Sequence, residues 1–266
     1  MENRFFWDPE VAEWEETAFS FNGTKWGRNR PAFPMLQPEK VLALPLSLRL
    51  NREYAYHLEG TGRVGERACY VVRFDPIDDA RSRYRGRVWI DAERFVKLKV
   101  QAVQTRLQPP VVSNEEVQVF EPVGQVGGRP AYLFTRLDSR QIMLLAGRNI
   151  LVEKQVAFSD FVLNDPAFET ERRRARNGDG VMYRDTDTGL RYLVKRGGER
   201  VVSDTPTTRA QAFMMGATID PSYDYPVPVV GLDYINFDFL RRNLQFAVIF
   251  AGVLAVGNVQ KARIGG

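Results

Sequence analysis

Apolar and polar residues alternate most regularly between Tyr54 and Thr105. The first run sets aromatic and aliphatic residues against small and polar ones, Tyr54, Tyr56 and Leu58 against Ala55, His57 and Glu59. A period of two residues is typical of a strand whose faces differ, because successive side chains point to opposite sides. The alternation returns at Tyr70–Phe74, Arg87–Asp91 and Val96–Ala102, with short turns between these segments. Four consecutive strands with short turns predict an antiparallel meander.

Further strand patterns follow the meander, and helix signals are few. Strands are expected at Val117–Val123, Ala131–Leu137, Gln141–Leu145 and, with a bend, Ile150–Leu163. Short helices are expected from Asp8-Pro9 to Trp14, at Phe168–Arg176 and at Thr207–Met215. The first of these rests on aspartate as a helix N-cap and on proline in the first turn. The predicted fold class is therefore mainly β, an antiparallel curved sheet with few short helices and a C-terminal β-hairpin.

Composition divides the chain into three parts. Turn formers and charges accumulate between Asn164 and Pro226, as in Asn177-Gly178-Asp179-Gly180 and Gly197-Gly198. We therefore expect an antiparallel β domain over residues 1–165 and a linker with a short hairpin (Arg191–Val202) over residues 166–226. Residues 227–266 form a third part with a pattern of its own.

This third part carries a long alternating run, Leu244–Gln260. Large apolar residues take one parity and mostly small residues the other, with Ile249 and Val253 as exceptions. Segments of about ten residues with one large apolar face are typical of outer-membrane strands. A buried sandwich hairpin and a core helix are the alternatives, although glycine and β-branched residues disfavour a helix. The favoured prediction is that residues 227–266 begin an outer-membrane β-barrel.

Charge and cysteine content exclude two classes of function. The 37 Lys and Arg are nearly balanced by 33 Asp and Glu, so we expect no nucleic-acid-binding groove. The single cysteine, Cys69, can form neither an internal disulfide nor a thiolate metal site, and a small core residue is the favoured interpretation. No stretch of about 18 apolar residues is present, and the first ten residues lack the apolar segment of a signal peptide.

The residues that carry enzyme chemistry do not occur as a set. His57 is the only histidine, which excludes a catalytic triad and a histidine zinc site, and it is expected to face solvent. Adjacent carboxylates point to opposite faces of a strand and are expected to be solvated charges, as at Glu15-Glu16, Asp78-Asp79 and Glu115-Glu116. Asp185–Gly189 lacks the remaining ligands of a calcium loop. We expect no catalytic residue, no metal site and no cofactor, and therefore a protein that is not an enzyme.

Aromatic residues on the strands are the remaining candidates for a functional surface. Six of them could line the concave side of a curved sheet: Tyr54, Tyr56, Tyr70, Phe74, Trp89 and Phe95. An ordinary core and an apolar cavity for a lipid use the same residue types, so composition leaves both interpretations open.

Four segments in order resemble the outer-membrane lipoprotein-sorting family, the LolA/LolB-like group. They are Leu42–Pro45, Tyr56–Val64, Cys69–Pro76 and Val88–Asp91, and the resemblance covers about residues 36–120. It implies an incomplete antiparallel barrel around helices, with an apolar cavity for acyl chains, in the periplasm or at the outer membrane. Compared with that family, the N-terminal part is short and the chain continues past the domain. We therefore expect a fragment of a longer cell-envelope protein whose signal peptide lies in a missing N-terminus.

Two functions from different classes follow from these patterns. The favoured one is non-catalytic binding of lipid or lipoprotein acyl chains in the concave apolar face of a half-barrel, with the outer membrane as the second partner. The alternative is a structural or interaction domain of a cell-envelope assembly that has no ligand cavity and pairs through edge strands. A domain that regulates an enzyme encoded elsewhere in a longer protein is a third possibility.

Overall fold

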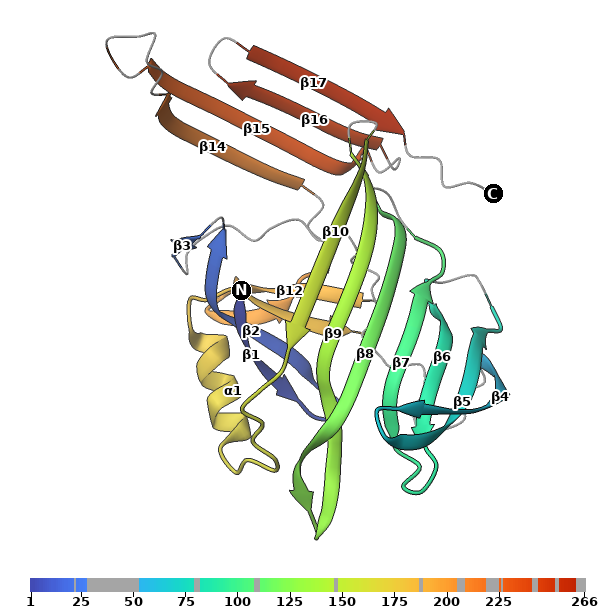
Figure 1. Ribbon diagram of the computed structural model, residues 1–266. Coiled ribbons are helices and arrows are strands. Elements are labelled where there is room, and N and C mark those ends of the chain that lie inside the picture. Colours follow the sequence, from blue (N-terminus) through green and yellow to red (C-terminus); the bar gives the residue numbers. More distant parts are fainter. Residues whose placement is uncertain are drawn as a thin grey trace.

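The computed structural model describes residues 1–21, 23–27, 53–78, 82–107, 111–145, 148–186, 189–204, 209–218, 225, 227–240, 244–251 and 254–261. These residues form three antiparallel sheets and one α-helix, so the mainly β fold class is confirmed (Figure 1). Within them, no helix is long and apolar enough to cross a membrane. The segment Leu42–Pro45, which contributes to the resemblance above, lies outside the described residues.

The largest sheet has seven strands that follow one another in sequence order. They are β4 (Tyr54–Val64), β5 (Arg67–Pro76), β6 (Tyr84–Asp91), β7 (Lys97–Gln104), β8 (Val111–Val126), β9 (Arg129–Leu145) and β10 (Arg148–Ala157). The predicted four-strand meander is confirmed, and three further strands extend it. The two strands expected within residues 131–145 are one strand, because the polar residues 138–140 between them pair with β8.

A second sheet combines the start of the chain with residues 182–202. Its order is β1 (Glu2–Trp7), β2 (Ala12–Phe21), β11 (Met182–Thr186), β12 (Gly189–Arg196) and β13 (Glu199–Val202), and β3 (Thr24–Trp26) pairs with β2. The helix expected from Asp8 to Trp14 is wrong. Asp8 Oδ1 accepts hydrogen bonds from the backbone N–H groups of Glu10 and Val11, both at 2.7 Å, and thereby closes the turn between β1 and β2. The same contacts would cap a helix, so the residue type alone did not distinguish the two.

Much of the expected linker belongs to this second sheet or packs against it. The expected linker contains α1 (Phe168–Asn177), which confirms the predicted helix. The predicted hairpin is confirmed as β12 and β13. Acidic residues in the first turn of α1 and basic residues in the last turn suit the helix dipole. The sheet and helix share a small core of Phe6, Ala175, Met182 and Leu193. Residues 168–186 and 189–202 are therefore part of a folded unit, and the expected linker is corrected over these ranges.

A buried carboxylate joins α1 to this sheet. Glu13 on β2 is fully buried, and its carboxylate contacts three guanidinium groups. Arg176 Nη2 lies 2.7 Å from Glu13 Oε1, Arg172 Nη1 lies 3.7 Å from Oε2, and Arg184 of β11 donates to Oε1. Because a buried charge needs hydrogen-bonded partners, these contacts tie the helix, β2 and β11 together.

Aromatic rings connect the second sheet to the first. Phe158, just after β10, lies 5.0 Å from the Phe134 ring of β9 and 5.6 Å from the Trp14 ring of β2, measured between centroids. Phe5 stacks on Trp14 at 3.9 Å. Phe158 therefore bridges the two sheets through contacts of the kind that aromatic pairs prefer.

The third sheet lies beyond one end of the long strands β8–β10 (Figure 1). Its order is β14 (Arg209–Thr218), β15 (Val227–Phe239), β16 (Leu244–Ala251) and β17 (Leu254–Lys261). The helix expected at Thr207–Met215 is wrong over its described residues, because 209–215 pair with β15. The long run Leu244–Gln260 is a hairpin of two strands. Gln245 Nε2 donates to the Leu144 carbonyl at 3.4 Å, which joins this sheet to β9.

Candidate functional site

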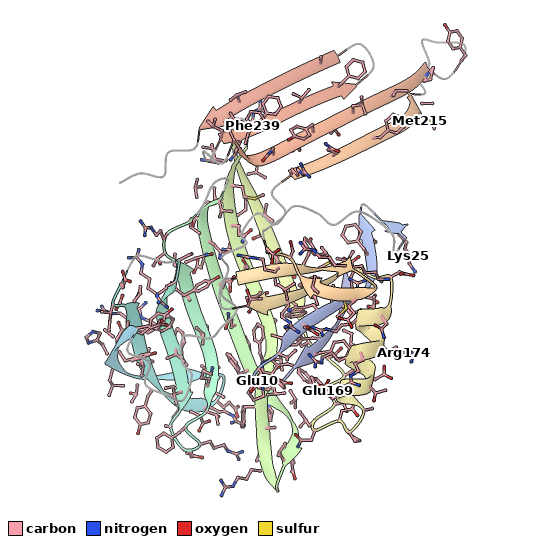
Figure 2. All side chains as sticks on the ribbon, turned by 180° about the vertical axis from the view of Figure 1, so that it is seen from behind. Glu10, Lys25, Glu169, Arg174, Met215 and Phe239 are labelled. Carbon is pink, nitrogen blue, oxygen red and sulfur yellow. The ribbon has the colours of Figure 1, made fainter. Side chains whose placement is uncertain are left out.

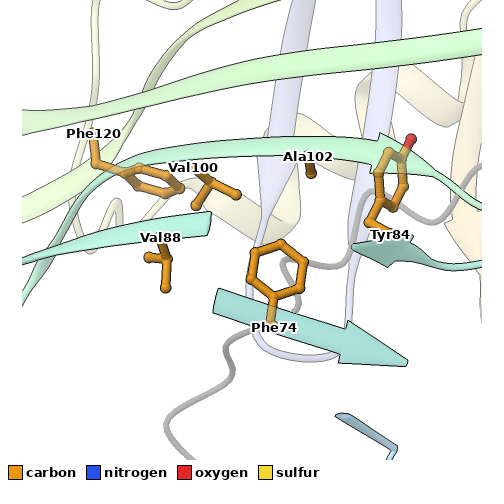
Figure 3. Packing of buried hydrophobic residues seen from close by; sticks show 6 residues of the cluster. All are labelled: Phe74, Tyr84, Val88, Val100, Ala102 and Phe120. Atoms are coloured by element: carbon orange, nitrogen blue, oxygen red, sulfur yellow. The ribbon is translucent and has the colours of Figure 1, made fainter. Parts of the chain in front are cut away.

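One face of the seven-stranded sheet carries its apolar core, and we term it the core face. Six buried residues pack together there: Phe74, Tyr84, Val88, Val100, Ala102 and Phe120 (Figure 3). Five more apolar residues are half-buried against them: Tyr54, Tyr56, Val72, Ile90 and Phe134. The arrangement follows from strand geometry, since residues two apart on a strand share a face and register aligns Val88 of β6 with Val100 of β7.

Strands β6 and β7 approach closely at Gly86, within the core face. A Cβ atom on Gly86 would lie 2.0 Å from the Gln101 carbonyl oxygen, so this position accepts only glycine without a shift of the backbone. Gly86 pairs with Phe74 on one side and with Ala102 on the other. Two small residues therefore lie beside the rings of Phe74 and Tyr84.

A column of polar side chains lies beside the apolar cluster on the same sheet. Asn114, Glu116 and Gln118 alternate along β8 and are 0%, 1% and 9% exposed. Asn114 Nδ2 donates to Gln104 Oε1 at 2.8 Å, and Ser139 Oγ donates to Asn114 Oδ1 at 3.1 Å. Gln118 Nε2 donates to Glu116 Oε2 at 3.3 Å. We term these five residues the polar column; their hydrogen bonds offset the loss of water that burial imposes.

Tyr84 belongs to both parts of the core face. Its ring packs in the apolar cluster, and its hydroxyl donates to Glu116 Oε1 at 3.2 Å and accepts a hydrogen bond from Asn114 Nδ2 at 3.3 Å. Burial, followed by the charge of Glu116, raises the pKa of the Tyr84 phenol well above its usual range. The hydroxyl therefore stays protonated and remains a hydrogen-bond donor to the carboxylate.

A lysine lies further along β7 and β8, beyond the polar column. Lys97 Nζ lies 5.0 Å from the centroid of the Phe120 ring, a distance suited to a cation–π contact. Burial lowers the pKa of the Lys97 ammonium to about 8. The core face thus has the amides and carboxylate of the polar column at one end and the ammonium group of Lys97 at the other. Its apolar cluster spans β5–β8.

The structure brings together only some of the six candidate residues. Tyr54, Tyr56 and Phe74 meet on the core face, where the Tyr54 and Phe74 rings lie 6.0 Å apart. Tyr70 instead stacks with Phe95 at 6.3 Å, and Phe95 is 67% exposed in the turn before β7. These two rings lie outside the apolar cluster, although Tyr70 is on the same side of the sheet as Val72 and pairs with Ile90.

Trp89 lies on the opposite side of the sheet from the core face. Its neighbour Val88 is fully buried in the cluster, and adjacent strand residues point to opposite sides. The Trp89 ring instead lies 4.7 Å from Lys99 Nζ and beside Gly62. Trp89 therefore does not share a surface with Tyr54, Tyr56 and Phe74.

The polar column was not predicted from the sequence. The pairs Glu15-Glu16 and Glu115-Glu116 were expected to be solvated, and this is wrong for Glu16 and Glu116, which are both buried. Along β8 both parities contain polar residues, so alternation gave no sign of which one is buried. Asn114, Glu116 and Gln118 are buried by the neighbouring strands β7 and β9. Their partners on these strands, Gln104 and Ser139, can be identified only once the register is known.

The two residues with reactive or titratable groups named from the sequence have the expected surroundings. Cys69 is fully buried, and burial raises the pKa of its thiol, which disfavours the reactive thiolate. His57 is exposed on β4. Among the described residues, no three His, Cys, Asp or Glu side chains are grouped closely enough to hold a metal ion.

The arrangement on the core face is suited to contact with an apolar molecule through rings and aliphatic groups, and to hydrogen bonding through the polar column.

Comparison with known protein families finds one match. Residues 17–110 are similar to the MucB/RseB N-terminal domain, and this range overlaps the 36–120 range of the LolA/LolB resemblance. Domains of the MucB/RseB family have a lipoprotein-binding-like fold related to LolA/LolB; they are periplasmic, non-catalytic and connected with envelope stress. The match covers about a third of the chain and includes β4–β7. No curated protein and no solved structure matches the chain.

Proposed function

We propose that this chain is a periplasmic, non-catalytic protein of the bacterial envelope that binds acyl chains of a lipid or lipoprotein on its core face, at the outer membrane. The observation that carries the proposal is the composition of that face, where Tyr54, Tyr56, Val72 and Ile90 are half-buried beside a fully buried apolar cluster. The similarity of residues 17–110 to a lipoprotein-binding-like domain supports it.

Acyl-chain binding needs burial of apolar surface and no chemical step. Each Å² of apolar surface removed from water contributes about 25 cal/mol, so a chain that covers two tyrosine rings gains several kcal/mol before the loss of entropy. Tyr56 is the most informative position because it is half-buried at the margin of the cluster and is not part of its buried centre. A ligand on the core face would contact it without first unfolding the protein.

The test is displacement of a dansyl-labelled fatty acid, and of a diacylated lipopeptide, from the full chain. We expect saturable binding, and Tyr56→Ser is expected to weaken it about tenfold through the loss of apolar contact. Trp89→Ser is the control, since Trp89 is an aromatic residue of the same sheet that lies on its opposite side, and the affinity of this variant is expected to change less than about twofold. A folded sample that binds neither probe would overturn the proposal.

A structural or interaction domain without a cavity is the second candidate. It is favoured by one observation: Phe74 and Val88 are already fully shielded from solvent within this chain. If this function is correct, the core face is a filled core and neither probe binds to the protein. Tyr56→Ser then lowers only the free energy of unfolding. Binding and unfolding measured on the same variants separate the two candidates.

A further inference from the structure

The third sheet has one strongly apolar exposed face, which we term the outer face. Its large exposed side chains are Phe213, Met215, Val230, Leu232, Phe250 and Val259. Register aligns Phe213, Leu232 and Phe250 in one row across three strands and sets Met215 beside Val230. Met215 is at the end far from the seven-stranded sheet, and Phe239 is at the near end (Figure 2). Contiguous exposed patches of this kind mark surfaces that contact another molecule or a membrane.

The near end of the outer face is polar on β14 and β15, and the same row continues into Phe246 and Val259 on β16 and β17. Arg209 pairs with Asn236, and Gln211 pairs with Tyr234. Asn236 Nδ2 donates to the Tyr234 hydroxyl at 3.2 Å, and the Tyr234 ring lies 5.9 Å from the ring of Phe246. Along β14 and β15, the outer face therefore changes from a margin with a positive charge, amides and a tyrosine to an apolar part.

This order of residues matches the layers of a lipid bilayer. Tyrosine is enriched at the boundary between headgroups and acyl chains, arginine is attracted to lipid phosphate, and aliphatic residues and phenylalanine favour the acyl region. We propose that the outer face of β14–β17 docks on the acyl-chain region of an anionic lipid bilayer, with Arg209, Tyr234 and Asn236 at the level of the headgroups.

The chemistry of the apolar part favours lipid over a protein partner. The row of Phe213, Leu232 and Phe250 and the pair of Met215 and Val230 contain no side-chain hydrogen-bond donor, and the weakly accepting sulfur of Met215 is their only side-chain acceptor. A specific protein interface forms about one hydrogen bond per 100–200 Å² and therefore needs such groups. Acyl chains need none.

The two faces of β15 differ in the way that one-sided docking requires. Asp233 lies between Leu232 and Tyr234 and so points to the opposite side of the sheet, with one carboxylate oxygen shielded from solvent. Its pairing partners are Ala212 and Ile249. Insertion that exposed both faces to acyl chains would place this carboxylate in hydrocarbon, which is costly. Only the outer face is suited to lipid.

A sheet that lies tilted on the bilayer, with its outer face toward the acyl chains, meets both conditions: one-sided docking and a near end at headgroup level. The proposal rests on the envelope location proposed above but uses a surface other than the core face.

The test places a polarity-sensitive NBD label on each face of the full chain. Cys69 is fully buried, and Cys69→Ser removes residual labelling, so single cysteines can be introduced at Leu232 on the outer face and at Ile235 on the opposite face. With vesicles of phosphatidylethanolamine and phosphatidylglycerol, the label at 232 is expected to shift to the blue and to be quenched by lipids brominated on their acyl chains. The label at 235 is expected to remain unquenched.

A pair of leucine variants provides the second measurement, co-sedimentation with the same vesicles. Leu232→Asp is expected to weaken vesicle binding about tenfold, because it places a charge against acyl chains. Leu58→Asp is the matched control: Leu58 is 66% exposed on β4, away from the outer face, and its variant is expected to bind vesicles like the parent chain.

Three outcomes would overturn the inference. They are an unchanged label at 232 in a folded sample, equal quenching at 232 and 235, and a blue shift that depends on protein concentration without vesicles, which would show that a second copy covers the face. Fatty-acid displacement measured on the same samples reports the core face separately. Failure of the ligand proposal is therefore distinguishable from failure of membrane docking.

Discussion

The hydroxyl of Tyr84 lies 3.2 Å from Glu116 Oε1, at the point where the apolar cluster of the core face meets the polar column. Glu116 is 1% exposed, and its carboxylate is also hydrogen-bonded by Gln118. This contact couples the two halves of the face, because one side chain supplies a ring to the first and a donor to the second. Its removal has effects that can be measured in two ways.

Tyr84→Phe is expected to destabilise the protein by about 1–3 kcal/mol, because it keeps the ring but leaves a buried carboxylate oxygen without this donor. The measurement is urea unfolding followed by circular dichroism. Tyr70→Phe is the control, expected to change stability by less than about 0.5 kcal/mol. Equal effects of the two substitutions would show that the Tyr84 hydroxyl contributes nothing specific.

The same contact predicts a loss of stability in alkaline solution. The pKa of Tyr84 is raised in the folded state, so the folded protein keeps a proton that the unfolded chain releases above about pH 10. The stability contributed by Tyr84 is therefore fully present below about pH 10 and is lost as the pH rises above it. Tyr84→Phe is expected to show a shallower decline in urea midpoint between neutral and strongly alkaline pH, and an identical decline would contradict the raised pKa.

Lys97 predicts a dependence of the opposite sign. Its pKa is lowered to about 8 in the folded state from the ordinary value of 10.5, so the unfolded chain binds more protons between these two values. The unfavourable effect of the buried charge is fully present below about pH 8 and is relieved as the pH rises toward 10.5. Lys97→Met is expected to raise the urea midpoint at pH 7 and to have much less effect near pH 10. Parallel curves for the variant and parent would be evidence against a buried ammonium.

Glu13→Gln is expected to destabilise the sheet formed by β1, β2 and β11–β13 by about 3 kcal/mol or more, because three arginines lose their shared carboxylate in a buried site. Hydrogen exchange measured by mass spectrometry can assign the loss to residues 168–186. Glu171→Gln removes the more exposed pairs with Arg4 and Arg174 and is expected to have an effect below about 1 kcal/mol. A similar loss from both variants would refute the special role of Glu13.

Gly86→Ala tests the close approach of β6 and β7. The added methyl group would collide with the backbone at Gln101, so we expect destabilisation of more than about 2 kcal/mol in urea unfolding. Gly257→Ala on β17 meets no atom within 4 Å and is expected to be close to neutral. If Gly86→Ala were tolerated equally well, the two strands could not be as close as described.

The meander was predictable from the sequence because each strand pairs with the next one and because its apolar residues recur at every second position. Tyr54, Tyr56, Val72 and Phe74 lie where their parity predicted, and each strand pairs with the next. The position of Trp89 shows the limit of this reasoning. Val88 and Trp89 are both apolar, so the pattern could not reveal that Val88 faces the core and Trp89 the other side.

Distant pairings could not be predicted. Trp14 of β2 lies opposite Tyr183 of β11, and nothing in either segment indicates the other. The resulting sheet explains why residues 182–186 and 189–202 are folded despite their glycines and charges: β11–β13 complete a sheet that β1 and β2 begin. Burial of Glu13 and Glu116 has the same origin, since each carboxylate is buried by residues of other strands or of α1.

The pairing of β2 with β11 also sets an order of assembly. During synthesis from the N-terminus, β4–β10 can pair as they emerge, because each strand needs only the one before it. The hairpin of β1 and β2 is made before the meander, but among the described strands its only partner besides the short β3 is β11, residues 182–186, which appears after the meander. This hairpin is thus enclosed later than the meander, and its apolar residues Phe5 and Trp14 stay uncovered by Phe158 and Tyr183 while the meander forms.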